Sequence, residues 1–296
     1  MNTAFYDHLD ADIKTILLAQ IRNLWTHHST SLEGNSLTLG ETDFILQEGL
    51  TIQGKPLKDH NEIYGHAKAI ERIYQLLNTT KPIDKQDLFH LHQTVLTERI
   101  IDIDQPVGQW KTQNNFTTYV NNNNQQIWRE YPAPRHIEHL MAQWLDKLNV
   151  FFSTVVDQSS AANAYADLHL SFVTIHPFFD GNGRMARLLA NLPVLNAGLP
   201  PIVVPQQDRF QYKRCLSDYQ NTVDDLPALE DLAQLPDNQQ KQQFVELCQG
   251  YWAETVQLLE AANMMQGRRY SNWELKINSQ QTSSAHPKPL TPIQFV

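Results

Sequence analysis

The sequence predicts an all-α fold with one β-hairpin. Apolar residues recur at spacings of three and four along most of the 296 residues, which is typical of helices that bury one face. Strand-like runs are confined to one short stretch of the chain. Apolar residues make up 41% and charged residues 19%, which is the composition of a globular protein with a true core.

The first predicted helices lie in the N-terminal quarter of the chain. An apolar stripe over residues 13–24 predicts the first helix. Thr38 and Glu41 have the spacing of a capping box, which opens a short helix, and Gly49 is placed to end it. Another stripe over residues 63–77 predicts a third helix.

The middle of the chain continues the helical pattern. Asp84 is a candidate N-cap for a helix that runs to Leu96. Between residues 161 and 175 apolar positions cover nearly the whole circumference, so this helix is expected at the centre of the fold. The remaining stripes predict helices over residues 137–148, 185–195, 210–223 and 244–261.

The single strand signal consists of two β-prone runs, Phe116–Val120 and Gln126–Trp128. They are joined by Asn121–Asn124, and asparagine tolerates the left-handed dihedrals of tight turns. A β-hairpin is therefore predicted, with a polar surface loop as the alternative. The last twenty or so residues are rich in Ser, Gln and Pro and are expected to form a tail without a core.

Charge and cysteine content exclude several classes of protein. The net charge of -9 disfavours partners such as nucleic acid or an anionic membrane. Two cysteines are too few for a disulfide scaffold and lack the paired spacing of a zinc site. The N-terminus has no secretory signal pattern, and the most apolar stretch is interrupted by Asn and Pro. A cytoplasmic protein that contacts neither membrane nor nucleic acid is expected.

One segment, residues 176–187, concentrates the chemistry of the sequence. It falls between the predicted central helix and the next helix. The turn formed by Gly181, Asn182 and Gly183 exposes backbone N–H groups without side-chain bulk, and the following helix adds positive dipole charge. These features indicate a cradle for an anion.

The flanking side chains suit phosphoryl chemistry. Arg184 and Arg187 are three residues apart, so both guanidiniums can converge on the same phosphates. Asp180 can hold a divalent cation against those phosphates, and His176 can accept a proton. The glycine spacing also fits a dinucleotide fingerprint, but a helical stripe precedes it instead of the required strand, so that interpretation is rejected.

This segment resembles the signature of the Fic (filamentation induced by cAMP) family, H-x-F-x-[D/E]-G-N-G-R-x-x-R, at every fixed position. The resemblance covers roughly residues 84–225, and it implies the Fic fold, a helical bundle with a β-hairpin flap. Lys111 departs from the pattern, because similar proteins often have Arg there, and is interpreted as a weakened but retained positive position. Other segments that carry the resemblance are Leu91-His92, Gly108–Lys111, Tyr131–Pro134, Gly198–Pro201 and Arg209-x-x-Tyr212.

The resemblance implies a protein adenylyltransferase, which moves AMP from ATP to a Tyr, Ser or Thr hydroxyl of a target protein. ATP is then the substrate and Mg2+ the cofactor. By position, the resemblance assigns the general base to His176, the Mg2+ ligand to Asp180, the anion hole to Gly181, Asn182 and Gly183, and further nucleotide contacts to Arg184, Arg187 and Tyr212. Arg184 would meet the departing phosphates and Arg187 the γ-phosphate.

The hairpin would serve as a flap that docks an extended segment of the target by strand addition. Because similar proteins often self-associate, a homodimer is also possible. The flap residues are Thr117, Thr118, Tyr119, Val120, Gln126, Ile127 and Trp128.

A second motif, Ser29, Glu33 and Gly34, resembles the family's inhibitory signature, [S/T]-x-x-x-E-[G/N]. Its position before the core resembles the class with an N-terminal inhibitory helix. Glu33 would then pair with Arg187, occupy the place of the γ-phosphate and misalign ATP. The pattern also permits Glu33 to activate a water that removes AMP.

These expectations divide the chain into three parts. Residues 1–83 form an N-terminal helical region with the inhibitory helix, residues 84–225 the Fic core domain, and residues 226–296 a C-terminal helical extension with a flexible tail.

Three alternatives remain open at this point. A kinase or another nucleotide or phosphate transferase could use the same fold, and a non-catalytic nucleotide-binding module could keep the site closed. A metal hydrolase is disfavoured because no H-E-x-x-H pattern occurs. Surface or capping roles are expected for His90, His92, His136 and His139.

Overall fold

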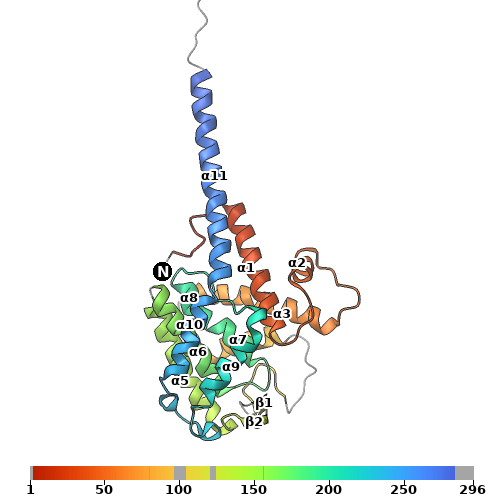
Figure 1. Cartoon of the computed structure of the whole chain (residues 1–296), viewed down its shortest axis with the longest axis vertical. Coiled ribbons are helices and arrows are strands. Elements are labelled where there is room, and N and C mark those ends of the chain that lie inside the picture. Colours follow the sequence, from red (N-terminus) through yellow and green to blue (C-terminus); the bar gives the residue numbers. More distant parts are fainter. Residues whose placement is uncertain (1–2, 80, 97–104, 121–124, 156, 284–296) are drawn as a thin grey trace, which may run out of the picture.

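The computed structural model describes residues 3–79, 81–96, 105–120, 125–155 and 157–283. These residues form a mostly helical fold with one two-stranded antiparallel sheet, as the sequence predicts (Figure 1). The α-helices and strands are α1 (Ala11–Ser31), α2 (Leu39–Glu48), α3 (Leu57–Leu77), α4 (Lys85–Val95), β1 (Phe116–Val120), β2 (Gln126–Glu130), α5 (Pro134–Thr154), α6 (Gln158–Ile175), α7 (Asn182–Leu189), α8 (Asn191–Asn196), α9 (Arg209–Gln220), α10 (Gln239–Gly250) and α11 (Ala253–Ser283).

Helix α6 is the centre of the fold and is buried on nearly all sides, which confirms the prediction from its apolar circumference. It packs against α5, α7, α8 and α10. The indole Nε1 of Trp144 on α5 donates to the carbonyl of Leu168 on α6 at 3.1 Å. The main core cluster runs from Phe5 to Ala262 and draws on all three predicted parts of the chain, and a second, smaller cluster consists of Leu37, Ile45 and Ile63.

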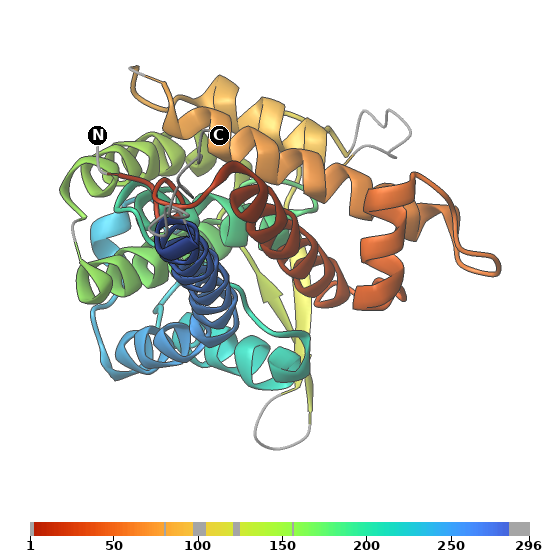
Figure 2. The same ribbon diagram turned by 90° about the horizontal axis from the view of Figure 1, so that it is seen from above.

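The N-terminal helices have the caps that the sequence predicts. The Thr38 side chain accepts from the Glu41 amide while Glu41 reaches back to the Thr38 amide, so the capping box at the start of α2 is confirmed. Gly49 ends α2 in a left-handed conformation with φ 69°. Helix α1 packs against α2, α3 and α11, an arrangement visible in both views (Figures 1 and 2).

The predicted helix over residues 244–261 is wrong as a single element. The chain breaks at Tyr251 and Trp252 into α10 and α11, and the Trp252 indole donates to the Pro200 carbonyl at 2.7 Å. Helix α11 then continues to Ser283, further than the sequence suggests, and extends beyond the rest of the helical body (Figure 1). No helix in the described ranges has the length and apolar character that a membrane span requires.

The predicted hairpin is confirmed, and its second strand is two residues longer than expected. Phe116 pairs with Glu130 and Val120 with Gln126 in an antiparallel register. The connecting Asn121–Asn124 lies outside the described residues. Arg129 connects β2 to α9 through hydrogen bonds to Gln220 and Ser217, and it also donates to Asn221, the residue after that helix.

Candidate active site

The candidate site is built on the loop between α6 and α7. His176 ends α6 in the left-handed region, with φ 52° and ψ 57°, and it is the one non-glycine residue with positive φ among the described residues. Such a conformation is uncommon for a side chain with a Cβ and is concentrated at functional sites. Gly181, with φ 78°, also adopts a left-handed conformation, immediately before α7. The loop therefore reverses the chain and places the N-terminus of α7 beside His176.

Buried side chains hold this loop in shape. The amide of Asn182 bonds both the N–H and the carbonyl of Phe178, at 3.0 and 2.8 Å, so its side chain serves the loop itself. Nδ1 of His92 accepts from the Gly108 amide at 2.9 Å, which leaves Nε2 to donate to the Asp180 carbonyl at 3.0 Å. The expectation of a surface or capping role for His92 is therefore wrong, because His92 is fully buried and fixes the loop.

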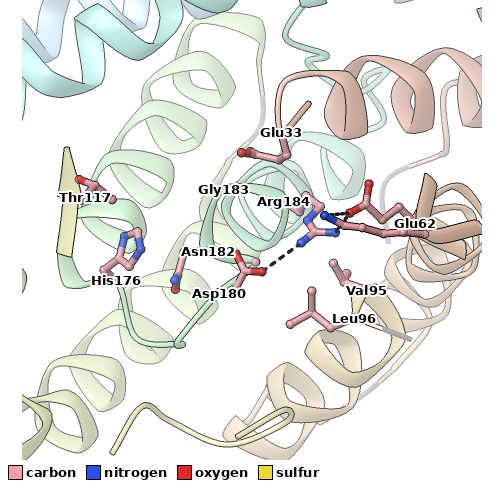
Figure 3. A pocket seen from close by; sticks show the side chains of 12 residues that line it. Glu33, Glu62, Val95, Leu96, Thr117, His176, Asp180, Asn182, Gly183 and Arg184 are labelled. Atoms are coloured by element: carbon pink, nitrogen blue, oxygen red, sulfur yellow. Dashed lines mark ion pairs between the residues drawn. The ribbon is translucent and has the colours of Figure 1, made fainter. Parts of the chain in front are cut away.

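A cavity of about 410 Å³ opens over this loop (Figure 3). It lies between α3, the end of α4, the first strand of the hairpin and the N-terminus of α7, so segments far apart in the sequence contribute to it. The residues that line it are Glu33, Lys58, Glu62, Val95, Leu96, Thr117, His176, Asp180, Gly181, Asn182, Gly183 and Arg184.

Two contacts fix the imidazole of His176. Its ring stacks on Tyr131 with centroids 3.8 Å apart. Nδ1 contacts the Val173 carbonyl at 3.3 Å, so Nδ1 carries the proton and Nε2 has the lone pair. Burial, and after it the charge of Lys111, lowers the pKa of His176 to about 3. The imidazole is therefore neutral at pH 7 and able to accept a proton.

Arg184 lies between two carboxylates. Its guanidinium is 3.8 Å from Asp180 on one side and 3.8 Å from Glu62 of α3 on the other (Figure 3). Arg184 is only 6% exposed, yet its Nε has no hydrogen-bond partner among the described residues. A buried donor without an acceptor at a cavity wall suits an anionic ligand. Sequence reasoning missed Glu62, because only the packing of α3 against α7 brings it here.

Arg187 is buried behind Glu33. Its Nη2 donates to Oε1 of Glu33 at 2.7 Å and to the Ser29 carbonyl at 2.8 Å, so the ion pair expected from the sequence is present. A Cβ on Gly183 would lie 2.6 Å from the same Glu33 oxygen, so only glycine leaves room for the carboxylate at the start of α7. Partial burial opposes the charge on Glu33, but Arg187 and then Lys213 lower its pKa to about 2.

Of the other predicted site residues, some line the cavity and others lie away from it. Thr117 reaches the cavity, whereas Trp128 is 71% exposed on the hairpin surface. Tyr212 is buried behind Arg187 and does not line the cavity. Gly34 takes φ 100° in the turn that follows Glu33, just beyond the end of α1.

The donor set fits a magnesium ion that arrives with a nucleotide. The Asp180 carboxylate is about half exposed at the cavity wall, and a carboxylate oxygen is a preferred Mg2+ ligand. In the described part of the chain no three His, Cys, Asp or Glu side chains come together as a metal site. Mg2+ is commonly held by one or two carboxylates together with substrate phosphates, which matches this arrangement.

The cavity is lined by a helix N-terminus, the buried Arg184 and the neutral imidazole of His176, with Arg187 buried behind Glu33, and this arrangement suits an anionic, phosphate-bearing ligand. In comparison with known proteins, residues 82–194 match the model of the Fic/DOC family. The chain is 33% identical to protein adenylyltransferase fic-1 of Caenorhabditis briggsae over 64% of its length, and 34% identical to protein adenylyltransferase Fic of Drosophila willistoni over 63%. These matches cover 35% and 34% of the two relatives, so the chain spans about a third of their length.

Solved structures share the fold. A Fic domain-containing signaling protein from Bacteroides thetaiotaomicron superposes with a TM-score of 0.70 at 24% identity, covering 86% of this chain and 90% of that one. Fic-1 (residues 134–508) from C. elegans gives 0.66 at 26% identity, covering 88% and 69%. The fold is thus the Fic fold. Residues 82–194 therefore resemble the Fic/DOC family, and about two thirds of the chain is similar to protein adenylyltransferases named Fic at about 33% identity.

Proposed function

We propose that this chain is a protein adenylyltransferase that transfers AMP from ATP to a Tyr, Ser or Thr hydroxyl of a target protein. The observation that supports it is the convergence, on one cavity wall, of the neutral His176, the glycine-lined start of α7 and Arg184. The relatives named as protein adenylyltransferases favour AMP transfer over transfer of phosphate.

In this reaction the target hydroxyl oxygen forms a bond to the α-phosphorus of ATP. The bond from that phosphorus to the bridging oxygen of pyrophosphate breaks, and the hydroxyl proton passes to Nε2 of His176. The N–H groups at the start of α7 and the Arg184 guanidinium would stabilise charge on the phosphates, so most of the rate enhancement would come from positioning and electrostatics. Asp180 would hold Mg2+, which neutralises phosphate charge when bound.

We further propose that Glu33 inhibits the enzyme. Its carboxylate lies against Gly183 and pairs with Arg187 at 2.7 Å, so it competes with a phosphate group for both. ATP that enters beside Glu33 would have its α-phosphate displaced, and a misplacement of about 1 Å can cost on the order of a hundredfold in rate.

The test is transfer of AMP from ATP labelled at the α-phosphate, with purified chain and with cell lysate. Glu33→Gly should increase labelling of the protein itself or of a target by at least about tenfold. His176→Ala in the same background should abolish labelling, since the base is lost.

A matched control is present in the chain. Glu48 also precedes a left-handed glycine at a helix end, but it is exposed on α2 and remote from the cavity lining. Glu48→Gly should leave labelling at the parent level. Equal labelling by the parent and by Glu33→Gly would reject the inhibitory role, and mass spectrometry that finds phosphate in place of AMP on the target would reject the transferase activity.

A further inference from the structure

The guanidinium of Arg187 donates hydrogen bonds to acceptors in two different parts of the fold. Ser29 and Glu33 on α1 and in the turn after it accept from Nε and Nη2. The hydroxyl of Tyr212, on α9, accepts from Nη1 at 3.3 Å. Among the described residues, Tyr212 is thus the one acceptor for Arg187 that does not belong to the Ser29–Glu33 segment.

Tyr212 is in turn fixed by a histidine of the central helix. Its hydroxyl lies 2.9 Å from Nε2 of His169 on α6, and both side chains are fully buried. A guanidinium can only donate, so the tyrosine oxygen accepts from Arg187 and its proton is directed to Nε2 of His169. The three residues therefore form a relay with one direction of donation, from Arg187 to Tyr212 to His169.

Tyr212 and His169 keep the protonation states that the relay needs. Burial, and after it the charge of Arg187, lowers the pKa of His169 to about 3, so its Nε2 remains an acceptor at neutral pH. Burial raises the pKa of Tyr212 to about 12, so the hydroxyl keeps its proton. Rings of Tyr165 and Phe244, with centroids 5.7 and 5.2 Å away, hold the imidazole plane.

The histidine is retained at a cost. Nδ1 of His169 has no hydrogen-bond partner among the described residues, although a buried donor left unpaired destabilises a fold. An apolar residue of similar size would avoid that cost. His169 lies on α6, and His176 caps the C-terminal end of the same helix.

We propose that Tyr212 and His169 are positioning residues that hold the Arg187 guanidinium where it recognises the terminal phosphate of a nucleoside triphosphate. This proposal rests on the proposed function. The relay fixes the guanidinium from the core side, so Arg187 stays in place when Glu33 gives way to the γ-phosphate. Tyr212, which the sequence suggested as a nucleotide contact, acts through Arg187.

The experiment measures dissociation constants for ATP and ADP, each with Mg2+, by calorimetry on full-length Glu33→Gly protein. Tyr212→Phe removes only the hydroxyl, and His169→Leu removes the acceptor. Each should weaken ATP binding on the order of tenfold and leave ADP binding unchanged, because only ATP has the γ-phosphate. His169→Gln restores an acceptor and should restore the preference for ATP.

Tyr219→Phe is the matched control. Tyr219 is another buried tyrosine of α9, and its hydroxyl donates to the Pro236 carbonyl instead. It should leave the ATP-to-ADP preference intact. Equal weakening of ATP and ADP, or an unchanged preference in both Tyr212→Phe and His169→Leu, would overturn the relay while the proposed function stands. A Glu33→Gly parent that binds no ATP would overturn both.

Discussion

At the scale of single residues, the site depends on charges that are buried close to one another. Lys111 is 2% exposed, donates to Asn115 at 2.6 Å and lies near enough to His176 to lower the pKa of that imidazole. Burial lowers the pKa of Lys111 itself to about 7, so this lysine is only partly charged at neutral pH. This partial charge is consistent with the weakened but retained positive position expected from the sequence.

Lys111→Met should raise the pKa of His176, because the positive charge that repels the second proton is removed while the side-chain volume is kept. An increase of about one unit is expected, the size of a typical shift from a neighbouring charge. Histidine resonances followed by NMR between pH 3 and 8 would measure it. Lys85→Met, an exposed lysine paired with Glu138, is the control. A pKa for His176 that is unchanged or lower in Lys111→Met would contradict the prediction.

Glu62 offers a second test of local charge. It faces Arg184 at 3.8 Å and accepts from the Asn35 amide at 3.0 Å. A bound triphosphate would draw the Arg184 guanidinium away from Glu62. The Glu62 carboxylate would then lie near the negative charge of the phosphates. Glu62→Gln keeps an acceptor for Asn35 and removes the charge, so ATP affinity should rise by roughly fivefold, the range of a partly exposed charge pair.

The affinity for ATP would be measured in the Glu33→Gly background to separate the two carboxylates. Glu71→Gln, an exposed glutamate on the same helix, should leave ATP affinity unchanged. Weaker binding by Glu62→Gln would mean that Glu62 orients Arg184 for the nucleotide, contrary to the prediction.

At the scale of elements, the sequence predicts a helix boundary well where residues close in sequence determine it. The capping box of Thr38 and Glu41 depends only on residues close in sequence, so the ends of α2 could be predicted to within a residue. The break between α10 and α11 could not, because it depends on the contact of Trp252 with Pro200, far away in the chain. The same holds for the site: the motif from His176 to Arg187 was recognisable, whereas its support by His92 exists only in the folded chain.

The hairpin illustrates how a tertiary contact positions an element. Arg129 on β2 is 9% exposed and bonds Gln220, Ser217 and Asn221 of α9 and the residue after it, with its guanidinium 4.1 Å from the Tyr119 ring. These charge-assisted bonds set the position of the hairpin relative to the cavity.

Arg129→Met should loosen the hairpin without emptying the nucleotide site. We expect faster hydrogen exchange of the strand amides and at least about fivefold less labelling of a protein target, with ATP affinity unchanged. Mass spectrometry of deuterium uptake, together with transfer assays, would measure both effects. Arg135→Met, an exposed arginine at the start of α5, is the control. Exchange at the parent rate in Arg129→Met would contradict the anchoring role.

At the scale of the whole molecule, histidines buried in their neutral form make the fold sensitive to acid. Burial, followed by the charges of Arg187 and Arg184, holds the pKa of His66 well below its usual range, and burial lowers that of His169 to about 3. In the unfolded chain both would titrate near 6.5, so the unfolded state binds more protons as the pH falls. The stability they confer is complete above pH 6.5 and is lost progressively below it.

With a folded pKa of about 3, His169 should therefore reduce the free energy of unfolding by about 2 kcal/mol between pH 7 and pH 5, and His66 should act in the same direction. Carboxylates contribute little in this window, because Glu33, with a pKa of about 2, would lose its stabilising charge only under stronger acid. Urea unfolding at pH 7, 6 and 5 would measure the slope. His169→Gln removes one titrating group, so its stability should fall less steeply than that of the parent, whereas His139→Gln, at an exposed histidine of α5, should keep the parent slope. A parent stability that is flat or rises toward pH 5 would contradict the burial of neutral histidines beside the arginines of the site.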